Sequence, residues 1–386
     1  MFKTIIVMVI NFVMMFTIKA EALQLKLLWE KKLPFAITDL QMAGVSGDII
    51  LSSKWSKQII LYDKGGNERF HWGPKVDRQP LEIGISEDGN YIIYVTAWTE
   101  EYVWNNNINL QEFGWNHKVH YVTKKGKELW NKEVGGMLYL SPNGQLIAAG
   151  AGAGEGPEGD FVLMNSIGNI LWNYSNNSGD DNIIFSPDSN YIALSSNPFY
   201  KLRLFDKSGN MLWERPYTEG IVSISENANY ISICPYNYSE IRHNGMVYDK
   251  NGNVVIEGFG VLSGDGKSLL MLYTDKITLM NLPQKATIKE YSIQAALSMI
   301  KSPIRETSYL LELSYDGRFV VVVGKKVGDM LNNNLFIIDV QEDKLLEMSA
   351  GVINTDGRVG IFLTKDGKYL LVHIYEEHKI LYYQVY

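Results

Sequence analysis

The chain has 386 residues, of which 46% are hydrophobic, 12% aromatic and 20% charged, and its formal net charge is −7. This composition excludes a chain that is disordered over most of its length. The acidic balance argues against a nucleic-acid-binding protein, which would carry a basic face or stripe. The one cysteine, Cys234, excludes an internal disulfide and a cysteine-based zinc or iron–sulfur site.

Residues 1–22 have the pattern of a secretory signal peptide. Lys3 supplies positive charge, residues 4–18 form an almost unbroken apolar run, and Ala20 and Ala22 are the small residues that a signal peptidase reads. The run is shorter than the roughly 20 apolar residues that span a bilayer as a helix. We therefore expect cleavage after Ala22 and a secreted or periplasmic protein, with an uncleaved anchor as the alternative. No cysteine lies near the cleavage point, so a lipoprotein is not expected, and no later segment predicts a transmembrane span.

A short polar turn followed by a strand recurs eight times along the remaining chain, residues 23–386. Two clear copies are Ser86-Glu87-Asp88-Gly89 and Ser186-Pro187-Asp188-Ser189. The leading residues of the eight copies are Ser46, Ser86, Ser141, Ser186, Ser225, Ser263, Ser314 and Thr364. Ser, Asp and Asn hydrogen-bond their own backbone in turns, and Gly accepts the positive φ of a tight hairpin. The repeat therefore predicts a chain of β-hairpins.

A second pattern follows each of these turns in the sequence. A short strand of alternating polarity ends in a polar residue, and a further turn leads to a strand that carries tryptophan in several units. Trp130, Trp172 and Trp213 each lie four residues after a glycine, and Trp72 occupies a similar place with two extra residues. We expect these four tryptophans to be structural. Each unit predicts four short strands within about 45 residues, which is the size of a propeller blade.

The two ends of the chain complete the count of strands. Residues 27–33 resemble the tryptophan strand without a partner before it, and residues 380–386 resemble the strand that precedes it. Their pairing would make an eighth, composite blade and remove two open sheet edges. The sequence thus predicts an all-β, eight-bladed β-propeller in one domain. Seven blades are the alternative, because Pro283 and residues 292–307 interrupt the pattern, and residues 293–300 have the composition of a short helix.

On these motifs the chain resembles the secreted β-propellers with PQQ-like or WD40-like repeats. The residues that carry the resemblance are 204–213, Leu-Phe-Asp-Lys-Ser-Gly-Asn-Met-Leu-Trp, and 185–188, Phe-Ser-Pro-Asp. The motifs are structural, so the resemblance implies the fold more than the function. That group includes quinoprotein dehydrogenases and non-catalytic envelope scaffolds such as the propeller subunit of outer-membrane protein assembly. This chain lacks the vicinal cysteine pair of the former and the lipid-anchored cysteine of the latter.

The longest insertions predict a ligand-binding rim. In a four-stranded blade the connections after the second and fourth strands emerge on the same face, and binding residues concentrate on such loops. The insertion at residues 97–118 is rich in aromatic rings, and the glycine-rich insertion at 150–160 is acidic. The predicted ligand-binding residues are Trp98, Tyr102, Trp104, Phe113, Trp115, Glu155 and Glu158. Rigid aromatic rings suit recognition of a protein or a glycan. The alternative is that these rings pack onto the propeller as a small satellite core.

The other motifs indicate little chemistry. The glycine run at 150–156 lacks the Lys-Ser/Thr of a phosphate-binding loop. Glu155, Glu158 and Asp160 lack the spacing of a calcium loop. His117 and His120 are a weak candidate pair of metal ligands. We expect no catalytic residue, no metal and no cofactor.

Three classes of function are compatible with these features. The favoured one is an exported, non-catalytic binding or scaffold propeller, monomeric, that recognises a protein or glycan through aromatic loops on one face. The second is an enzyme, either a quinone-dependent oxidoreductase or a polysaccharide-acting lyase or hydrolase. The third is a structural surface-layer component that associates with itself.

Overall fold

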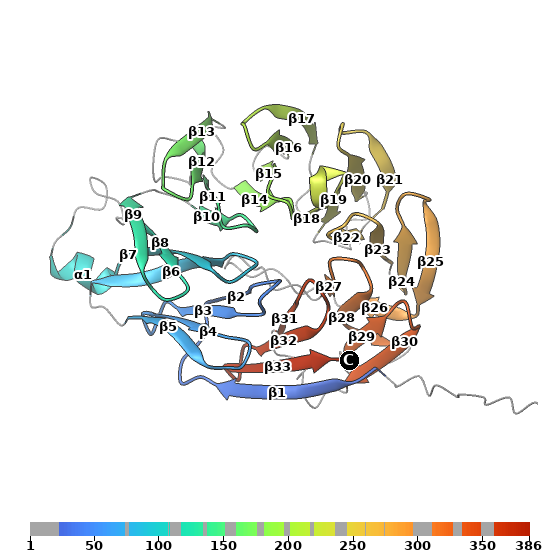
Figure 1. The fold of residues 1–386 in the computed structure, drawn as a ribbon, viewed down its shortest axis with the longest axis horizontal. Helices are drawn as coiled ribbons and strands as arrows, with labels where there is room; N and C mark the ends of the chain where they lie inside the picture. Colours follow the sequence, from blue (N-terminus) through green and yellow to red (C-terminus); the bar gives the residue numbers. More distant parts are fainter. Residues whose placement is uncertain are drawn as a thin grey trace, which may run out of the picture.

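The computed structural model describes residues 23–73, 77–106, 108, 117–133, 137–150, 160–175, 181–196, 201–216, 220–235, 245–258, 260–273, 275–295, 311–326, 334–348 and 359–386. These residues form eight antiparallel sheets that are arranged as the blades of a closed ring (Figure 1). The prediction of an all-β, eight-bladed propeller is confirmed, and the alternative of seven blades is wrong.

Blades 1 to 4 follow one another along the chain, each with its strands paired in sequence order. Blade 1 contains β2 (Asp39–Met42), β3 (Ile49–Ser53), β4 (Gln58–Tyr62) and β5 (Glu68–Trp72). Blade 2 contains β6 (Arg78–Ile85), β7 (Tyr91–Trp98), β8 (Lys118–Thr123) and β9 (Glu128–Glu133), with helix α1 (Glu100–Asn105) between β7 and β8. Blade 3 contains β10 (Met137–Leu140), β11 (Leu146–Gly150), β12 (Asp160–Asn165) and β13 (Ile170–Ser175). Blade 4 contains β14 (Asp181–Phe185), β15 (Tyr191–Ser196), β16 (Lys201–Asp206) and β17 (Met211–Pro216).

Blades 5 to 7 continue the same order. Blade 5 contains β18 (Gly220–Ile224), β19 (Tyr230–Pro235), β20 (Met246–Asp249) and β21 (Val254–Glu257), with a 3-10 turn, η1 (Glu226–Ala228), after β18. Blade 6 contains β22 (Gly260–Leu262), β23 (Ser268–Leu272), β24 (Ile277–Asn281) and β25 (Ala286–Tyr291). In blade 7, β28 (Phe319–Lys326) pairs with β29 (Asn334–Asp339), which pairs with β30 (Lys344–Met348). The inner side of β28 pairs with two short strands, β26 (Ile293–Ala295) and β27 (Leu311–Leu313).

Blade 7 corrects one expectation from the sequence. Residues 293–300 have the composition of a short helix, but Ile293–Ala295 form β26, and Ile293 pairs with Lys326 of β28. Ile293 is buried against the interior of blades 6 and 7, and burial of this β-branched side chain favours the strand. Residues 296–300 lie outside the described residues.

Blade 8 closes the ring with both ends of the described chain. It contains β31 (Val359–Leu363), β32 (Tyr369–Ile374), β33 (Lys379–Val385) and, as its fourth strand, β1 (Leu25–Lys32). The register of β1 and β33 runs from Leu25 opposite Val385 to Lys32 opposite Lys379. In Figure 1 β1 lies along β33 at the edge of this blade. The predicted composite blade is therefore confirmed.

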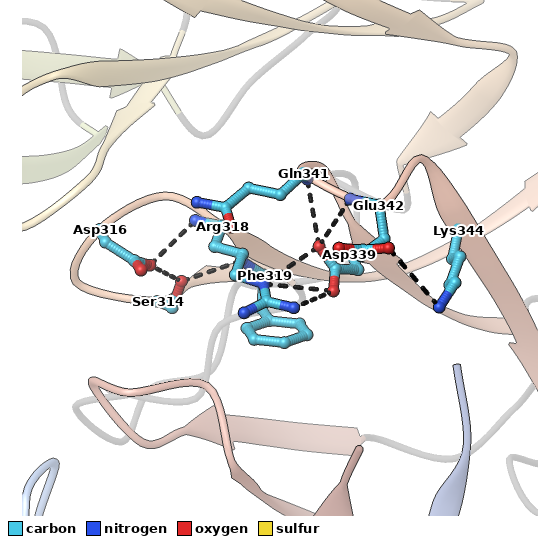
Figure 2. Close-up of polar contacts among 8 residues, drawn as sticks. All are labelled: Ser314, Asp316, Arg318, Phe319, Asp339, Gln341, Glu342 and Lys344. Atoms are coloured by element: carbon cyan, nitrogen blue, oxygen red, sulfur yellow. Dashed lines mark hydrogen bonds and ion pairs between the residues drawn. The ribbon is translucent and has the colours of Figure 1, made fainter. Parts of the chain in front are cut away.

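The repeated serine turns join the first and second strands of the blades, and Figure 2 shows the copy in blade 7. The Ser314 hydroxyl accepts a hydrogen bond from the Phe319 N–H at 2.9 Å and donates to Asp316 at 2.7 Å. Asp316 in turn accepts the Arg318 N–H at 3.0 Å. The Ser314 side chain is fully buried and its hydroxyl is hydrogen-bonded both as donor and as acceptor, so this polar group stabilises the turn instead of being left unpaired.

Neighbouring turns of this type also bond to one another around the ring. The Glu87 N–H donates to the Pro142 carbonyl at 2.8 Å, which joins blades 2 and 3. The Tyr315 N–H donates to the Lys365 carbonyl at 2.8 Å, which joins blades 7 and 8, and the Lys365 N–H donates to the Gly44 carbonyl at 2.7 Å, which joins blades 8 and 1. We call the side of the propeller that carries these turns the turn face, and the opposite side the loop face.

The core is divided among the junctions between blades. Within the described residues, each pair of neighbouring blades encloses one cluster of buried apolar side chains. Between blades 8 and 1, for example, Leu371 and Tyr382 pack with Leu40 and Leu51. Because every blade contributes to two clusters, the ring holds each sheet from both sides.

The repeat tryptophans fasten the outer strand of one blade to the next blade. The indole N–H donates to a backbone carbonyl in the neighbouring turn in four cases: Trp29 to Lys64, Trp130 to Ser166, Trp172 to Lys207 and Trp213 to Lys250, at 2.8 to 3.0 Å. Glycine at the turn leaves room for the ring, since a Cβ on Gly209 would lie 2.8 Å from the Trp172 ring. These contacts agree with a structural role for the repeat tryptophans.

In blade 1 the equivalent position belongs to Phe70 and not to Trp72. Phe70 pairs with Leu61 as Trp213 pairs with Leu204 in blade 4. Its ring fills the space over Gly126 of blade 2, whereas the Trp72 ring lies against Tyr94 with centroids 5.9 Å apart. The prediction that Trp72 takes the repeat position is wrong by two residues.

Candidate functional site

The aromatic insertion of blade 2 begins with a short helix on the loop face. The Thr99 hydroxyl caps α1 by accepting the Tyr102 N–H at 3.1 Å. Glu100 and Glu101 occupy its first turn, where negative charge suits the exposed backbone N–H groups. The one buried residue of the helix is Val103. The sequence predicts a loop here, and the Thr99 cap with the first-turn carboxylates explains why residues 100–105 are helical instead.

The structure separates the predicted ligand-binding residues into three groups. Trp98 and Tyr102 are half-buried and pack against each other, with ring centroids 6.0 Å apart. Trp104 projects outward and is 79% exposed. The remaining predicted residues lie outside the described residues: Phe113, Trp115, Glu155 and Glu158. Trp98 and Tyr102 thus contact each other, whereas the Trp104 ring is left in solvent.

A second exposed tryptophan lies close to α1 and was missed by the sequence analysis. Trp55, in the turn between β3 and β4 of blade 1, is 75% exposed. This turn joins a second strand to a third strand, so it emerges on the loop face as α1 does. The Lys57 ammonium group lies 4.0 Å from the Glu101 carboxylate, which brings the turn next to the helix. The turn has only four residues, so its length does not mark it as a binding loop. Its position between the second and third strands of a blade does place it on the loop face.

Trp55 and Trp104 differ from the other described tryptophans. Those others are buried or half-buried, and four of them bond to the next blade as described above. Large apolar side chains that stay in water on neighbouring loops are typical of an interaction site. The Lys54 ammonium group lies 5.7 Å from the Trp55 ring centroid, so a positive charge lies beside this exposed ring. We call Trp55, Trp104, Glu100 and Glu101 the tryptophan face.

The candidate metal pair does not present free imidazoles. His120 is buried, its Nδ1 lies 2.7 Å from the Glu128 carboxylate, and its Nε2 lies 3.2 Å from the Thr96 hydroxyl. Burial lowers the pKa of His120 even though Glu128 opposes that shift. His117 is also engaged in an interaction. Among the residues that the structure describes, no three His, Cys, Asp or Glu side chains gather as a metal site.

No helix in the described part of the chain is long and apolar enough to cross a membrane. The residues of the predicted signal peptide lie outside the described residues.

Comparisons with known proteins agree with the fold. No model of a protein family matches the sequence, and no curated protein matches it. Among solved structures, the chain is similar to the C-terminal WD40 domain of Sif2, with a TM-score of 0.60, 11% identity, and coverage of 93% of this chain and 98% of that chain. It is also similar to BamB from Moraxella catarrhalis, with a TM-score of 0.56, 13% identity, and coverage of 94% and 98%.

A third similar structure is the β-propeller domain of Cps50 (Swd1) from Myceliophteria thermophila, with a TM-score of 0.52, 12% identity, and coverage of 94% of this chain and 100% of that chain. Identities this low show the fold alone. The chain is an eight-bladed β-propeller, and its resemblance to propellers of WD40-like and PQQ-like repeats is confirmed at the level of structure.

Proposed function

We propose that this propeller is an exported, non-catalytic binding protein or scaffold that recognises a protein or glycan through the tryptophan face. The observation that carries the proposal is the exposure of Trp55 and Trp104 on neighbouring loops of one face. Aromatic rings on a rigid scaffold provide contact area with little loss of side-chain entropy on binding. The ring of eight blades holds the two loops in place, because the core clusters extend on both sides of blades 1 and 2.

Affinity capture from a cell-envelope and culture-medium extract tests this proposal. The baits are the chain from residue 23 onward and its Trp55→Ala/Trp104→Ala variant. A matched control removes exposed apolar side chains on the outer strands of blades 5 and 6, Val254→Ala/Ile288→Ala. We expect a partner that the unchanged chain and the control retain and that the tryptophan variant loses. A partner retained equally by all three baits, or by none, would contradict the tryptophan face.

The chemical nature of the partner follows from treating the extract before capture. Loss of capture after protease digestion identifies a protein, and loss after periodate oxidation identifies a glycan. Export is tested separately, by fractionating the source cells and sequencing the N-terminus of the recovered protein. We expect it outside the cytoplasm with Leu23 as its first residue. Light scattering of that protein checks the expected monomer.

A further inference from the structure

Among the strands that the structure describes, the outer strand of each blade has one long edge without a neighbour. In blade 3 this strand is β13, which pairs with β12 on one side. No strand in the described ranges pairs with its other side. Such edges present unpaired backbone N–H and C=O groups to any extended chain, and proteins protect them with charged residues, proline or bulges.

β13 lacks the charged residues that protect the other outer strands. Its sequence is Ile-Leu-Trp-Asn-Tyr-Ser, and the turn before it, residues 165–169, is also uncharged. The charged residues of the seven other outer strands are Lys26, Glu30, Lys31 and Lys32 in β1, Glu68 and Arg69 in β5, Glu128, Lys132 and Glu133 in β9, Glu214 and Arg215 in β17, Glu257 in β21, Lys289 and Glu290 in β25, and Lys344 and Glu347 in β30. In a chain that is 20% charged, residues 161–179 contain no charged side chain.

The uncharged edge also exposes apolar side chains. Ile170 is 65% exposed and Leu171 is 47% exposed. Ile167 in the preceding turn is exposed as well, and so is Met211 at the start of the outer strand of blade 4. Exposed apolar side chains beside an open edge are the surface that pairing with another strand would bury.

β13 is held firmly in the position where such a strand would pair. The Trp172 indole N–H donates to the Lys207 carbonyl of blade 4 at 3.0 Å. The Tyr174 and Phe205 rings pack edge to face, with their centroids 5.1 Å apart. A bulge lies at Leu171, and regular pairing with β12 runs from Trp172 to Ser175. Equivalent bulges occur in the outer strands of other blades, so the missing charge is what distinguishes β13.

Two occupants are possible for the β13 edge, a second folded propeller or an extended segment, and the length of the edge favours the segment. A stable contact between two folded proteins buries about 1,200–2,000 Å². The six residues of β13 span about 20 Å, so two propellers that pair along this strand alone would bury much less than that. An extended segment needs no second folded surface, since it can follow the edge and cover Ile170 and Leu171. We propose that β13 binds an extended, uncharged segment of a partner protein as a fifth strand of blade 3.

A library of linear peptides of about twelve residues, displayed on phage and selected on the chain from residue 23 onward, tests this proposal. Peptides enriched on the unchanged protein are synthesised and titrated against Leu171→Lys and Leu212→Lys variants. Leu212 of β17 precedes its tryptophan as Leu171 does, and it is similarly exposed. Because both side chains are exposed, we expect both variants to retain the melting temperature of the unchanged protein to within a few degrees.

We expect Leu171→Lys to weaken peptide binding about tenfold, because the new charge lies on the edge where the peptide pairs. Leu212→Lys should change binding by no more than about twofold, because β17 does not bind the peptide. Methylation of alternate peptide nitrogens should also abolish binding, because it removes backbone donors. No enrichment, equal binding to both variants, or no effect of methylation would overturn the proposal. Sedimentation that shows a dimer abolished by Leu171→Lys would also overturn it, in favour of a second copy. The Trp55→Ala/Trp104→Ala variant should bind the peptides normally, which separates this site from the tryptophan face.

Discussion

The Tyr315 hydroxyl donates a hydrogen bond to the Glu226 carboxylate, and the 2.5 Å between their oxygens links blade 7 to blade 5 across the turn of blade 6. The two residues are 89 positions apart in the chain. The contact is possible because Gly264 of blade 6 lies beneath the tyrosine ring, where a Cβ would be 2.3 Å from Cδ2. On the turn face this bond therefore ties together three consecutive blades.

Removal of the hydroxyl with Tyr315→Phe should lower the free energy of unfolding by about 2 kcal/mol, because the bond has a charged acceptor that is left without its donor. Glu226→Gln should cost less, since a neutral amide still accepts the bond. Chemical denaturation of both single variants and the double variant measures the coupling. If the two effects add with no coupling, the bond contributes nothing to stability.

Gly264→Ala should also destabilise the fold, by about 1–3 kcal/mol, because the new methyl group must displace the Tyr315 ring. The backbone of Gly264 has no positive φ, so the effect is steric. Gly65→Ala is the matched control, since its Cβ would meet only the ends of the Asn67 and Asp63 side chains, each at 3.2 Å. Thermal unfolding of the two variants compares them. Equal melting temperatures would mean that the tyrosine ring moves aside without loss.

His373→Leu should make the protein more resistant to acid. His373 is 1% exposed in blade 8, and neither ring nitrogen has a hydrogen-bond partner within the described structure. Burial, and then the neighbouring His378, lowers the pKa of His373 to about 3. The unfolded chain binds a proton near pH 6.5 and the folded chain does not, so stability falls as the pH drops from there toward 3.

The slope of this loss is about 1 kcal/mol per pH unit, and urea denaturation between pH 7 and pH 4 measures it. The leucine variant should lose less stability over this interval than the unchanged protein. His71→Leu is the control, because the His71 side chain is exposed on the outer strand of blade 1. Parallel curves for the unchanged protein and His373→Leu would show that His373 is not the source of acid sensitivity.

Glu312→Gln should increase stability as the pH rises above the ordinary pKa of a glutamate. Burial at β27, and then the charge of Glu87, raises the pKa of Glu312 well above its usual range. The unfolded chain loses this proton near pH 4.5 while the folded chain keeps it, so stability falls as the pH rises from there through the folded pKa. The glutamine variant should therefore gain stability over the unchanged protein between pH 5 and pH 8. Melting temperatures whose difference does not change with pH would contradict this assignment.

Trp29→Ala should destabilise blade 8, the blade that closes the ring. The Trp29 ring stacks on Tyr382 with centroids 5.0 Å apart, and its N–H bonds to the Lys64 carbonyl of blade 1. Loss of this ring should cost about 3 kcal/mol, as for other packed aromatic residues. Trp104→Ala is expected to change stability by less than about 0.5 kcal/mol, because its ring is in solvent. Similar losses in the two variants would mean that Trp29 does not hold the blade.

The architecture could be predicted from the sequence because each blade repeats the same local rules. The Ser-x-Asp-Gly turns act within five residues, so spacing alone reveals them. The same reasoning, applied strictly to the four-residue offset from Gly66, would have selected Phe70 instead of Trp72. Contacts between blades could not be predicted from spacing. Tyr315 and Glu226, for example, are 89 positions apart and come together only because the blades are arranged in a ring.

The candidate site was predictable only in part. Trp104 was identified from its aromatic loop, but the same loop also contains Trp98 and Tyr102, which pack together, and composition does not distinguish the two outcomes. Trp55 was missed because its turn is short. Its candidacy rests on two facts that only the structure shows: the Trp55 ring is exposed, and its turn lies beside α1.

The pairing of β1 with β33 sets the order in which the molecule can mature. β1 leaves the ribosome before every other described strand, yet its pairing partner β33 is the last of the described strands. Until β33 has been made, the early strand therefore has no native neighbour on that side, and blade 8 cannot be completed. A nascent chain that stalls before β33 would expose two unfinished ends, which quality-control proteases and chaperones can recognise.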